Sequence, residues 1–149
     1  MKKFKTLIVD DELHGRENLR ALLNNHCGEI EIVGEASSVS EARDKVIELK
    51  PEVVFLDILM PVHNGFDLLD HFAERTFAVI FVSASVEFGI QAVKAGVLDY
   101  VLKPINIKEL QLAVGKVRAY FEKGGGIELI ANNEFTSIAL AHSNGFSME

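Results

Sequence analysis

The sequence has little that would suit export or insertion into a membrane. Cys27 is its only cysteine, which excludes an internal disulfide framework and suits a reducing compartment. No apolar run approaches the roughly 20 residues of a membrane span, and the N-terminal residues lead into a predicted strand instead of a signal-peptide hydrophobic region. We therefore expect a soluble, cytoplasmic protein with no membrane partner.

An excess of positive charge is also missing. The net charge is −7, and the basic residues are scattered along the chain instead of forming a block. Such a chain lacks the electrostatic footprint that neutralises nucleic-acid phosphates, so we do not expect these residues to bind DNA by themselves. With 149 residues, 48% of them hydrophobic, the chain is long enough for one well-filled core and too short for two ordinary domains. One compact domain with a tail is the expectation.

Strand and helix patterns alternate along the chain. Short apolar runs bounded by polar residues predict strands buried on both faces, and apolar residues at helical spacing predict the helices between them. Capping-box patterns begin at Ser38 and Asn106, and Gly96 is a predicted helix end. The predicted strands are 7–9, 30–33, 51–57, 77–82 and 98–102, and the predicted helices cover about 12–26, 38–49, 66–72, 86–95 and 106–120.

Five such units with short loops predict an α/β fold. Right-handed crossovers give a doubly wound, five-stranded parallel sheet, most simply the flavodoxin-like order 2-1-3-4-5, whose switch point lies between the first and third strands. Asp10 and Asp11 follow the first strand, and Asp57 follows the third. The three carboxylates are therefore expected at one edge of the sheet. Because like charges held together repel, this cluster favours a hard cation, Mg²⁺, beside a reactive aspartate.

Two further polar residues are expected at the same edge. The fourth strand ends in Ser83 and the fifth in Lys103, which add a hydroxyl and an ammonium group to the carboxylates. A nucleophile, a metal, a hydrogen-bond donor and a cation are the groups that phosphoryl transfer requires. The pattern therefore indicates phosphoryl transfer to an aspartate.

This set of residues resembles the receiver domain of two-component response regulators, which has the CheY-like fold. The resemblance covers about residues 4 to 122 and rests on five elements in the right order: Asp10-Asp11, Asp57 within Phe-Leu-Asp-Ile-Leu-Met-Pro, Gly65 eight residues later, Ser83-Ala84, and Asp99-Tyr100-Val101-Leu102-Lys103-Pro104. It implies a signalling domain, not a conventional enzyme, that catalyses only its own phosphorylation and dephosphorylation.

The resemblance also implies a role for each site residue. Asp57 accepts a phosphoryl group from the phosphohistidine of a sensor histidine kinase, and Lys103 pairs with that group. The implied Mg²⁺ ligands are Asp11, Asp57 and the backbone carbonyl of Leu59, with Asp10 acting through water. Ser83 moves to bond the phosphoryl group, and the Lys103-Pro104 peptide bond is expected to be cis. Leu59 departs from the pattern, because many relatives carry a polar side chain there, and this leaves the lifetime of the aspartyl phosphate open.

Each of these residues also has an ordinary structural explanation. A lone aspartate after a strand is usually a cap or turn former, Ser83 is able to cap the following helix, and Lys103 alone could be a solvated lysine. It is the five matched positions together that favour the functional interpretation. Tyr100 stays open between ordinary strand packing and the switch that the family has at this position.

Other functions of similar folds fit the residues less well. A flavin-binding flavodoxin needs a phosphate-binding loop after the first strand, where Asp10-Asp11-Glu12 would repel the ligand. A haloacid-dehalogenase-type phosphatase needs a second aspartate where this chain has Leu59, and the cobalamin-binding Asp-x-His-x-x-Gly spacing is absent around Asp11 and His14. A pseudo-receiver, or a stand-alone receiver that acts as a protein docking module, stays open as the alternative.

The C-terminal residues predict a separate segment. Residues 1–123 form the expected receiver domain, 124–126 a glycine linker, and 127–149 a short β tail with two strands around Asn132-Asn133. Residues 138–146 resemble the first strands of the DNA-binding domain of LytTR-type regulators. This resemblance implies a truncated regulator of transcription that binds DNA only through the missing output domain. Separately, movement of Ser83 and Tyr100 on phosphorylation is expected to change the face of the fourth helix, fifth strand and fifth helix, through which a homodimer forms. A disordered or add-on tail stays open.

Overall fold

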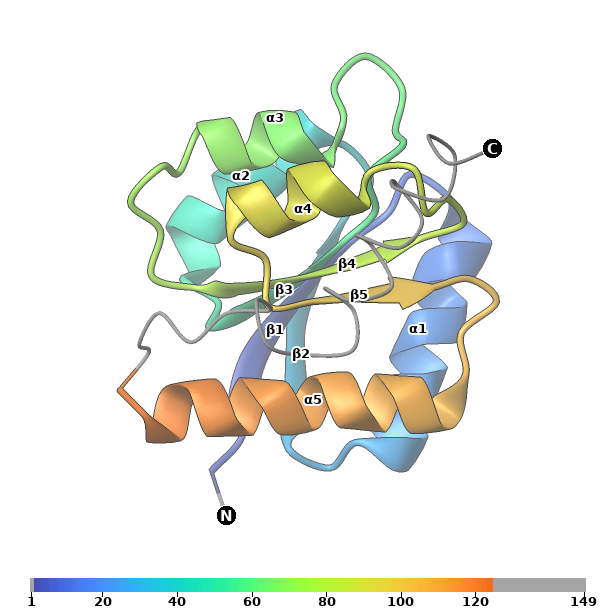
Figure 1. Cartoon of the computed structure of the whole chain (residues 1–149), viewed down its shortest axis with the longest axis vertical. Coiled ribbons are helices and arrows are strands. Elements are labelled where there is room, and N and C mark those ends of the chain that lie inside the picture. Colours follow the sequence, from blue (N-terminus) through green and yellow to red (C-terminus); the bar gives the residue numbers. More distant parts are fainter. Residues whose placement is uncertain (1, 125–149) are drawn as a thin grey trace, which may run out of the picture.

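The computed structural model describes residues 2–124 and shows a five-stranded parallel sheet between two layers of helices (Figure 1). The strand order β2-β1-β3-β4-β5 confirms the predicted doubly wound α/β topology. The strands are β1 (Phe4–Val9), β2 (Ile30–Ala36), β3 (Val53–Leu56), β4 (Ala78–Ser83) and β5 (Asp99–Leu102), and the helices are α1 (Leu13–His26), α2 (Val39–Leu49), α3 (Gly65–Asp70), α4 (Gly89–Ala95) and α5 (Ile107–Glu122).

Each face of the sheet has its own hydrophobic core. One core packs α2, α3 and α4 against side chains such as Leu7, Leu56 and Phe81, and the other packs α1 and α5 against Ile8 and Phe55. Alternate residues of one strand thus enter opposite cores, as the period of two requires. All four residues of β3 and all six of β4 are buried. This explains why these strands are continuous apolar runs in the sequence.

Local capping signals begin and end several helices where the sequence predicts. Ser38 accepts a hydrogen bond from the Glu41 amide at 3.1 Å, but the Glu41 carboxylate accepts from the Ser37 amide instead of completing the box on Ser38. Asn106 accepts from the Glu109 amide at 3.0 Å. Gly96 ends α4 with a φ of 74°, the left-handed conformation that glycine adopts without strain.

Some predicted boundaries were wrong by a few residues. The fourth helix begins at Gly89 and not near residue 86, because Ser85 and the residues after it form a turn held by the bond from the Glu87 amide to the Ser85 hydroxyl. The third helix ends at Asp70, so Phe72 lies beyond it and packs edge-on against Phe77 at 5.6 Å between ring centroids. The second strand continues to Ala36, three residues further than predicted.

The described residues also bear on two wider expectations. Within residues 2–124, no helix is long and apolar enough to cross a membrane. Gly124, the first residue of the predicted linker, follows α5 with a φ of 76°. The rest of the linker and the predicted β tail of residues 127–149, including its resemblance to LytTR-type domains, lie outside the described residues.

Candidate functional site

Three aspartates converge at the carboxyl ends of the two central strands. Asp10 follows β1 and Asp57 follows β3, and these strands are parallel neighbours with Val9 opposite Leu56. One carboxylate oxygen from each of Asp10, Asp11 and Asp57 lies within 4.8 Å of the others. Asp10 and Asp57 are buried, and Asp11 is half-buried. The structure therefore brings together the three carboxylates that the sequence placed at this edge.

A lysine from the edge strand β5 joins the carboxylates. Lys103 follows β5, and its Nζ donates to Asp10 Oδ2 at 2.8 Å and lies 3.5 Å from Asp57 Oδ2. The peptide bond from Lys103 to Pro104 is cis. Burial lowers the pKa of Lys103, but hydrogen bonds and negative charge from Asp10 and Asp57 outweigh burial, so the net shift of the pKa is upward. The ammonium group is therefore charged at neutral pH and pairs more closely with Asp10 than with Asp57.

The electrostatic environment of Asp57 is unfavourable for its charged form. Burial raises the pKa of Asp57 to about 6, Lys103 partly offsets this effect, and the nearby Asp10 carboxylate adds to it. Three carboxylates face one ammonium group, so the formal charge of the cluster is −3 + 1 = −2. The side chains of the cluster therefore carry a net negative charge.

The donor set fits a magnesium ion. Hard divalent cations prefer carboxylate and carbonyl oxygens, and this site offers one oxygen from each of three carboxylates close together. The Leu59 backbone lies in the loop after Asp57, while its side chain is exposed and adds no ligand atom. A divalent cation would also offset the formal charge of −2.

Ser83 and Tyr100 lie on the strands beside the acidic cluster. Ser83 ends β4, is buried, and accepts a hydrogen bond from the Ser85 amide at 3.2 Å. The Tyr100 ring is already turned inward: it packs edge-on against Phe81 at 6.0 Å between centroids, and its hydroxyl donates to the Ser85 carbonyl. Burial raises the pKa of Tyr100 to about 12, so the hydroxyl stays protonated.

The loop between β3 and α3, which follows Asp57, has an unusual backbone. Val62 has a φ of 71°, and the His63 amide donates to the Pro61 carbonyl at 2.8 Å, which closes a three-residue γ-turn around Val62. A β-branched residue rarely adopts positive φ. Further along, a Cβ at Gly65 would lie 2.7 Å from the Asp57 carbonyl oxygen, so only glycine allows α3 to begin this close to the acceptor.

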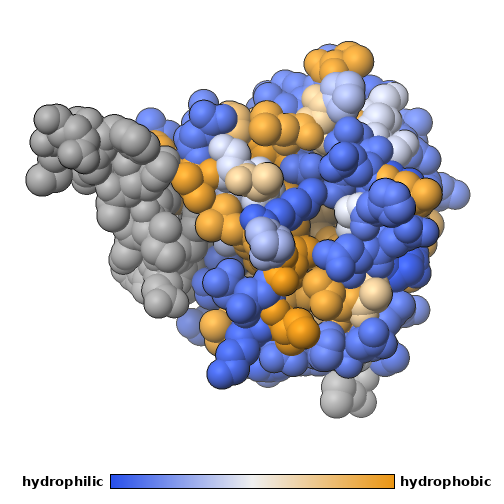
Figure 2. All heavy atoms as spheres, turned by 90° about the vertical axis from the view of Figure 1, so that its right-hand side faces the viewer, coloured by the Kyte–Doolittle hydropathy of each residue, from blue (hydrophilic) through white to orange (hydrophobic). Residues whose placement is uncertain are grey.

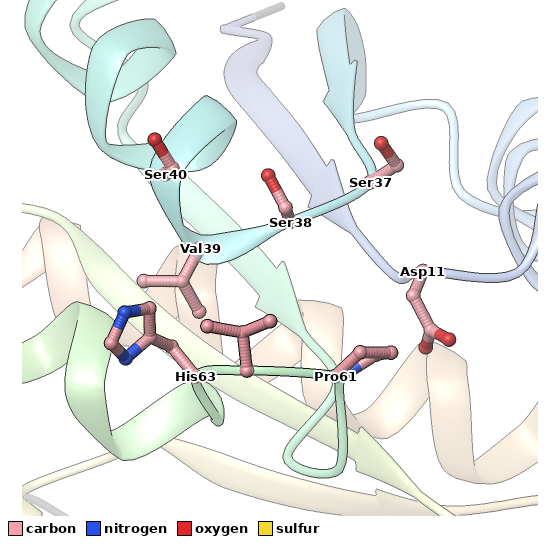
Figure 3. Close-up of a pocket in the computed structure, with 8 residues that line it drawn as sticks. Asp11, Ser37, Ser38, Val39, Ser40, Pro61 and His63 are labelled. Carbon is pink, nitrogen blue, oxygen red and sulfur yellow. The ribbon is translucent and has the colours of Figure 1, made fainter.

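A shallow groove of about 460 Å³ adjoins the acidic cluster (Figure 3). Ser37, Ser38 and Ser40 lie along one side, and Pro61 and His63 lie on the opposite loop, with Asp11 at one end. The same edge of the molecule faces the viewer in Figure 2, where apolar side chains lie among polar ones. Leu13, Leu59 and Val62, which follow Asp11 and Asp57 in the chain, are exposed. The groove meets the acidic cluster at Asp11.

Two residues near the site were missed by the sequence analysis. Arg16 in the first turn of α1 donates to the Asp10 carbonyl at 2.8 Å and to Glu35 at 3.0 Å. Glu35 lies 19 residues away on β2. No local pattern joins them, because the contact depends on how β2 aligns with β1. The predicted strand also ended at residue 33, two residues before Glu35.

Comparisons with known proteins show the family to which the chain belongs. Residues 6–115 match the family model described as "Response regulator receiver domain". An uncharacterized response regulatory protein of Vibrio cholerae is 39% identical over 118 residues, which cover 78% of this chain and 49% of the relative. The transcriptional regulatory protein BtsR of Salmonella typhi is 42% identical over 115 residues, which cover 76% of this chain and 48% of BtsR. The chain thus spans about half the length of these curated relatives.

Solved structures show the same fold. The REC domain of AraT, a response regulator from Geobacillus stearothermophilus, has a TM-score of 0.72 at 30% identity and covers 83% of this chain and 98% of that domain. The response regulatory domain of mrkE from Klebsiella pneumoniae has a TM-score of 0.73 at 26% identity, covering 80% of this chain and 98% of that one. The match in each case spans nearly the whole of the solved domain.

Proposed function

Because this chain belongs to the response regulator receiver domain family of two-component signalling, we propose that Asp57 accepts a phosphoryl group from the phosphohistidine of a sensor histidine kinase. The observation that carries this proposal is the convergence of Asp10, Asp11, Asp57 and Lys103 at the carboxyl edge of the sheet. Receiver domains are signalling domains, and they generally bind Mg²⁺ at an acidic pocket of this kind.

The chemistry follows from the positions of these side chains. An oxygen of the Asp57 carboxylate attacks phosphorus, the bond from phosphorus to the histidine nitrogen breaks, and an aspartyl phosphate forms. The Nζ of Lys103 lies 3.5 Å from Asp57 Oδ2, which supports its pairing with the negative oxygens of the transferred group. Asp11, Asp57 and the Leu59 carbonyl would hold Mg²⁺, with Asp10 acting through water. The ion supplies positive charge to the phosphoryl oxygens when it is bound.

The output is the second part of the proposal. BtsR is named a transcriptional regulatory protein, and it extends well beyond the region that matches this chain. We infer that phosphorylation controls transcription through a LytTR-type DNA-binding domain. The new charge on Asp57, about −1.5 to −2, would draw Ser83 and Lys103 toward it. Tyr100 would respond to the movement of Ser83 and change the α4-β5-α5 face, through which activation favours a homodimer. The position of the Tyr100 ring supports a link between Tyr100 and Ser83. The Tyr100 hydroxyl donates to the Ser85 carbonyl, and the Ser85 amide donates to the Ser83 hydroxyl.

Acetyl phosphate and intact-protein mass spectrometry test the acceptor directly. The wild-type chain should gain one phosphoryl group in Mg²⁺ and none in excess chelator, and Asp57→Asn should gain none. Asp70→Asn, which changes an exposed aspartate on α3, is the matched control and should label like wild type. Full labelling of Asp57→Asn would refute the assignment. A wild-type chain that is never labelled would favour the pseudo-receiver alternative, a docking module that does not accept a phosphoryl group.

The link to the dimer face needs a separate measurement. Sedimentation velocity with a beryllofluoride mimic of the phosphoryl group should show tighter self-association of the wild type. Ser83→Ala should weaken this response while Ser40→Ala, at the nearby groove, leaves it unchanged. Equal responses of wild type and Ser83→Ala would contradict the proposed coupling through Ser83.

A further inference from the structure

The guanidinium group of Arg16 joins two elements of the sheet edge behind the acidic cluster. Its NH1 donates to the backbone carbonyl of Asp10 at 2.8 Å, and its Nε donates to Glu35 Oε1 at 3.0 Å. The Arg16 side chain is only 16% exposed. A guanidinium with two fixed acceptors holds them in a defined geometry, because its donors form a rigid planar fork.

Glu35 is itself held from both sides. Its second carboxylate oxygen accepts from Arg20 Nε at 2.5 Å, and its backbone carbonyl accepts from Lys45 on α2. Glu35 therefore forms a fixed anchor at the end of β2, tied to both α1 and α2. Through its hydrogen bond to the Asp10 carbonyl, Arg16 connects this anchor to the loop between β1 and α1.

The Asp10 carbonyl belongs to the peptide unit that joins Asp10 to Asp11, so its position sets where both side chains begin. The other contacts of Asp10 agree with a closely defined position. Its amide donates to the Ala36 carbonyl at 3.0 Å, and its Oδ1 accepts from the Glu12 amide at 2.9 Å. A Cβ at position 15 would lie 2.3 Å from Asp10 Oδ2, so Gly15 leaves the space that this carboxylate fills.

We propose that Arg16, anchored by Glu35, is a positioning residue that fixes the Asp10-Asp11 peptide and thereby sets the Mg²⁺ affinity of the site. This inference rests on the proposed function, because it concerns the magnesium site of the phosphoryl acceptor. Arg16 contacts neither the ion nor the reacting atoms; it acts through the backbone that carries two of the three carboxylates.

Arg20 allows the positioning role to be separated from a general contribution to folding. It binds the same Glu35 carboxylate as Arg16 does, from the next turn of the same helix. The hydrogen bond to the Asp10 carbonyl comes from Arg16. Replacing either arginine by methionine removes an ion pair with Glu35, but only the Arg16 change also releases the Asp10 carbonyl.

The experiment is a Mg²⁺ titration by isothermal calorimetry on the full chain, with wild type, Arg16→Met and Arg20→Met compared. The Mg²⁺ dissociation constant should rise roughly tenfold in Arg16→Met, the size expected when a group that orients metal ligands is lost, and less than about twofold in Arg20→Met. Urea unfolding of each variant measures the general loss of stability. Arg16→Lys, which is able to reach one acceptor but not both in the same fork, should recover part of the affinity.

Two outcomes would overturn this role of Arg16. Equal weakening in Arg16→Met and Arg20→Met would show that Arg16 acts only through the fold, and unchanged affinity in Arg16→Met would show that the contact does not set the site. If Arg16→Met does not fold, Glu35→Gln replaces it, because glutamine keeps an acceptor for Arg16 but removes the charge that anchors Arg16. Glu35→Gln should weaken Mg²⁺ binding. Unchanged Mg²⁺ affinity of Glu35→Gln would also overturn the role of Arg16. A wild type that binds no Mg²⁺, or binds equally after Asp11→Asn, would instead refute the proposed function and this inference with it.

Discussion

The two ends of the sheet differ in how completely their charges are balanced. At the amino end, Glu52 accepts from Lys2 at 2.9 Å and from the Lys5 amide at 3.0 Å, and Arg118 pairs with Glu29 at 2.6 Å. These ion pairs lie at the surface, and each carboxylate has a cation of its own. At the carboxyl end, three carboxylates share the single ammonium group of Lys103.

This difference separates the part of the molecule that stabilises the fold from the part that we propose accepts the phosphoryl group. The ion pairs at the amino end balance their charges without any ligand. At the carboxyl end, the three carboxylates and Lys103 have a formal charge of −2, and Val62 lies in a strained γ-turn. Unfavourable arrangements of this kind persist only where the surrounding structure enforces them, and they are common at functional sites. A phosphoryl acceptor that needs Mg²⁺ gains from such an arrangement, because the cation and the transferred group supply what is missing.

The largest expected loss of stability comes from the core near the amino end. Leu23 on α1 is fully buried, so Leu23→Ala should lower the free energy of unfolding by about 3 kcal/mol in urea denaturation. Leu112→Ala, an exposed leucine on α5, should change it by less than about 0.5 kcal/mol. The Mg²⁺ affinity of the folded protein should be unchanged in both. A large change in Mg²⁺ affinity for Leu23→Ala would show that the two ends are not separate.

Removal of the shared cation should have the next largest effect. Lys103→Met removes the cation that contacts the Asp10 and Asp57 carboxylates, so it should lower the free energy of unfolding by about 2 kcal/mol in chelator. Saturating Mg²⁺ should recover part of this loss, because it supplies positive charge to the same carboxylates. Lys94→Met, an exposed lysine on α4, is the control. Equal stabilities of the two variants in chelator would contradict the account of the carboxyl end.

The smallest effect is expected at the γ-turn. Val62→Gly should raise the free energy of unfolding by about 1 kcal/mol, because glycine adopts positive φ without strain. Val62→Ala removes most of the exposed side chain but keeps a Cβ, so it should give no such gain. Thermal unfolding of the three proteins provides the comparison. A gain of equal size in Val62→Ala would assign the effect to the exposed side chain and not to the backbone.

The sequence predicted the architecture and most of the site because both depend on local patterns. Apolar runs such as Val53 to Leu56 are buried on both faces, and only a parallel sheet covered by helices on both sides buries them so. Parallel strands bring their carboxyl ends to one edge, and this placed Asp10 and Asp57 together before any distance was known.

Features that depend on the exact alignment of distant segments were not predictable. The contact of Arg16 with Glu35 depends on how β2 pairs with β1, and that pairing shifts register between Thr6 and Leu7. The shorter distance from Lys103 to Asp10 than to Asp57 depends on side-chain positions. The sequence analysis began the third helix at about residue 66 and did not identify the capping box that Asn64 and Asp67 form at its start.

The free energy of unfolding of wild type and Asp57→Asn, measured in chelator from pH 4 to pH 8, tests the central claim most directly. The pKa of Asp57 is raised to about 6 from an ordinary value of 3.8, so the neutral carboxyl favours the folded state. This contribution is present below about pH 4 and is lost as the pH rises through about 6. Asparagine stays neutral, so Asp57→Asn should match wild type near pH 4 and be more stable by about 2 kcal/mol at pH 8, a gap that saturating Mg²⁺ should narrow. If Asp57→Asn is no more stable than wild type at pH 8 in chelator, the carboxyl end does not carry the unbalanced charge on which this account depends.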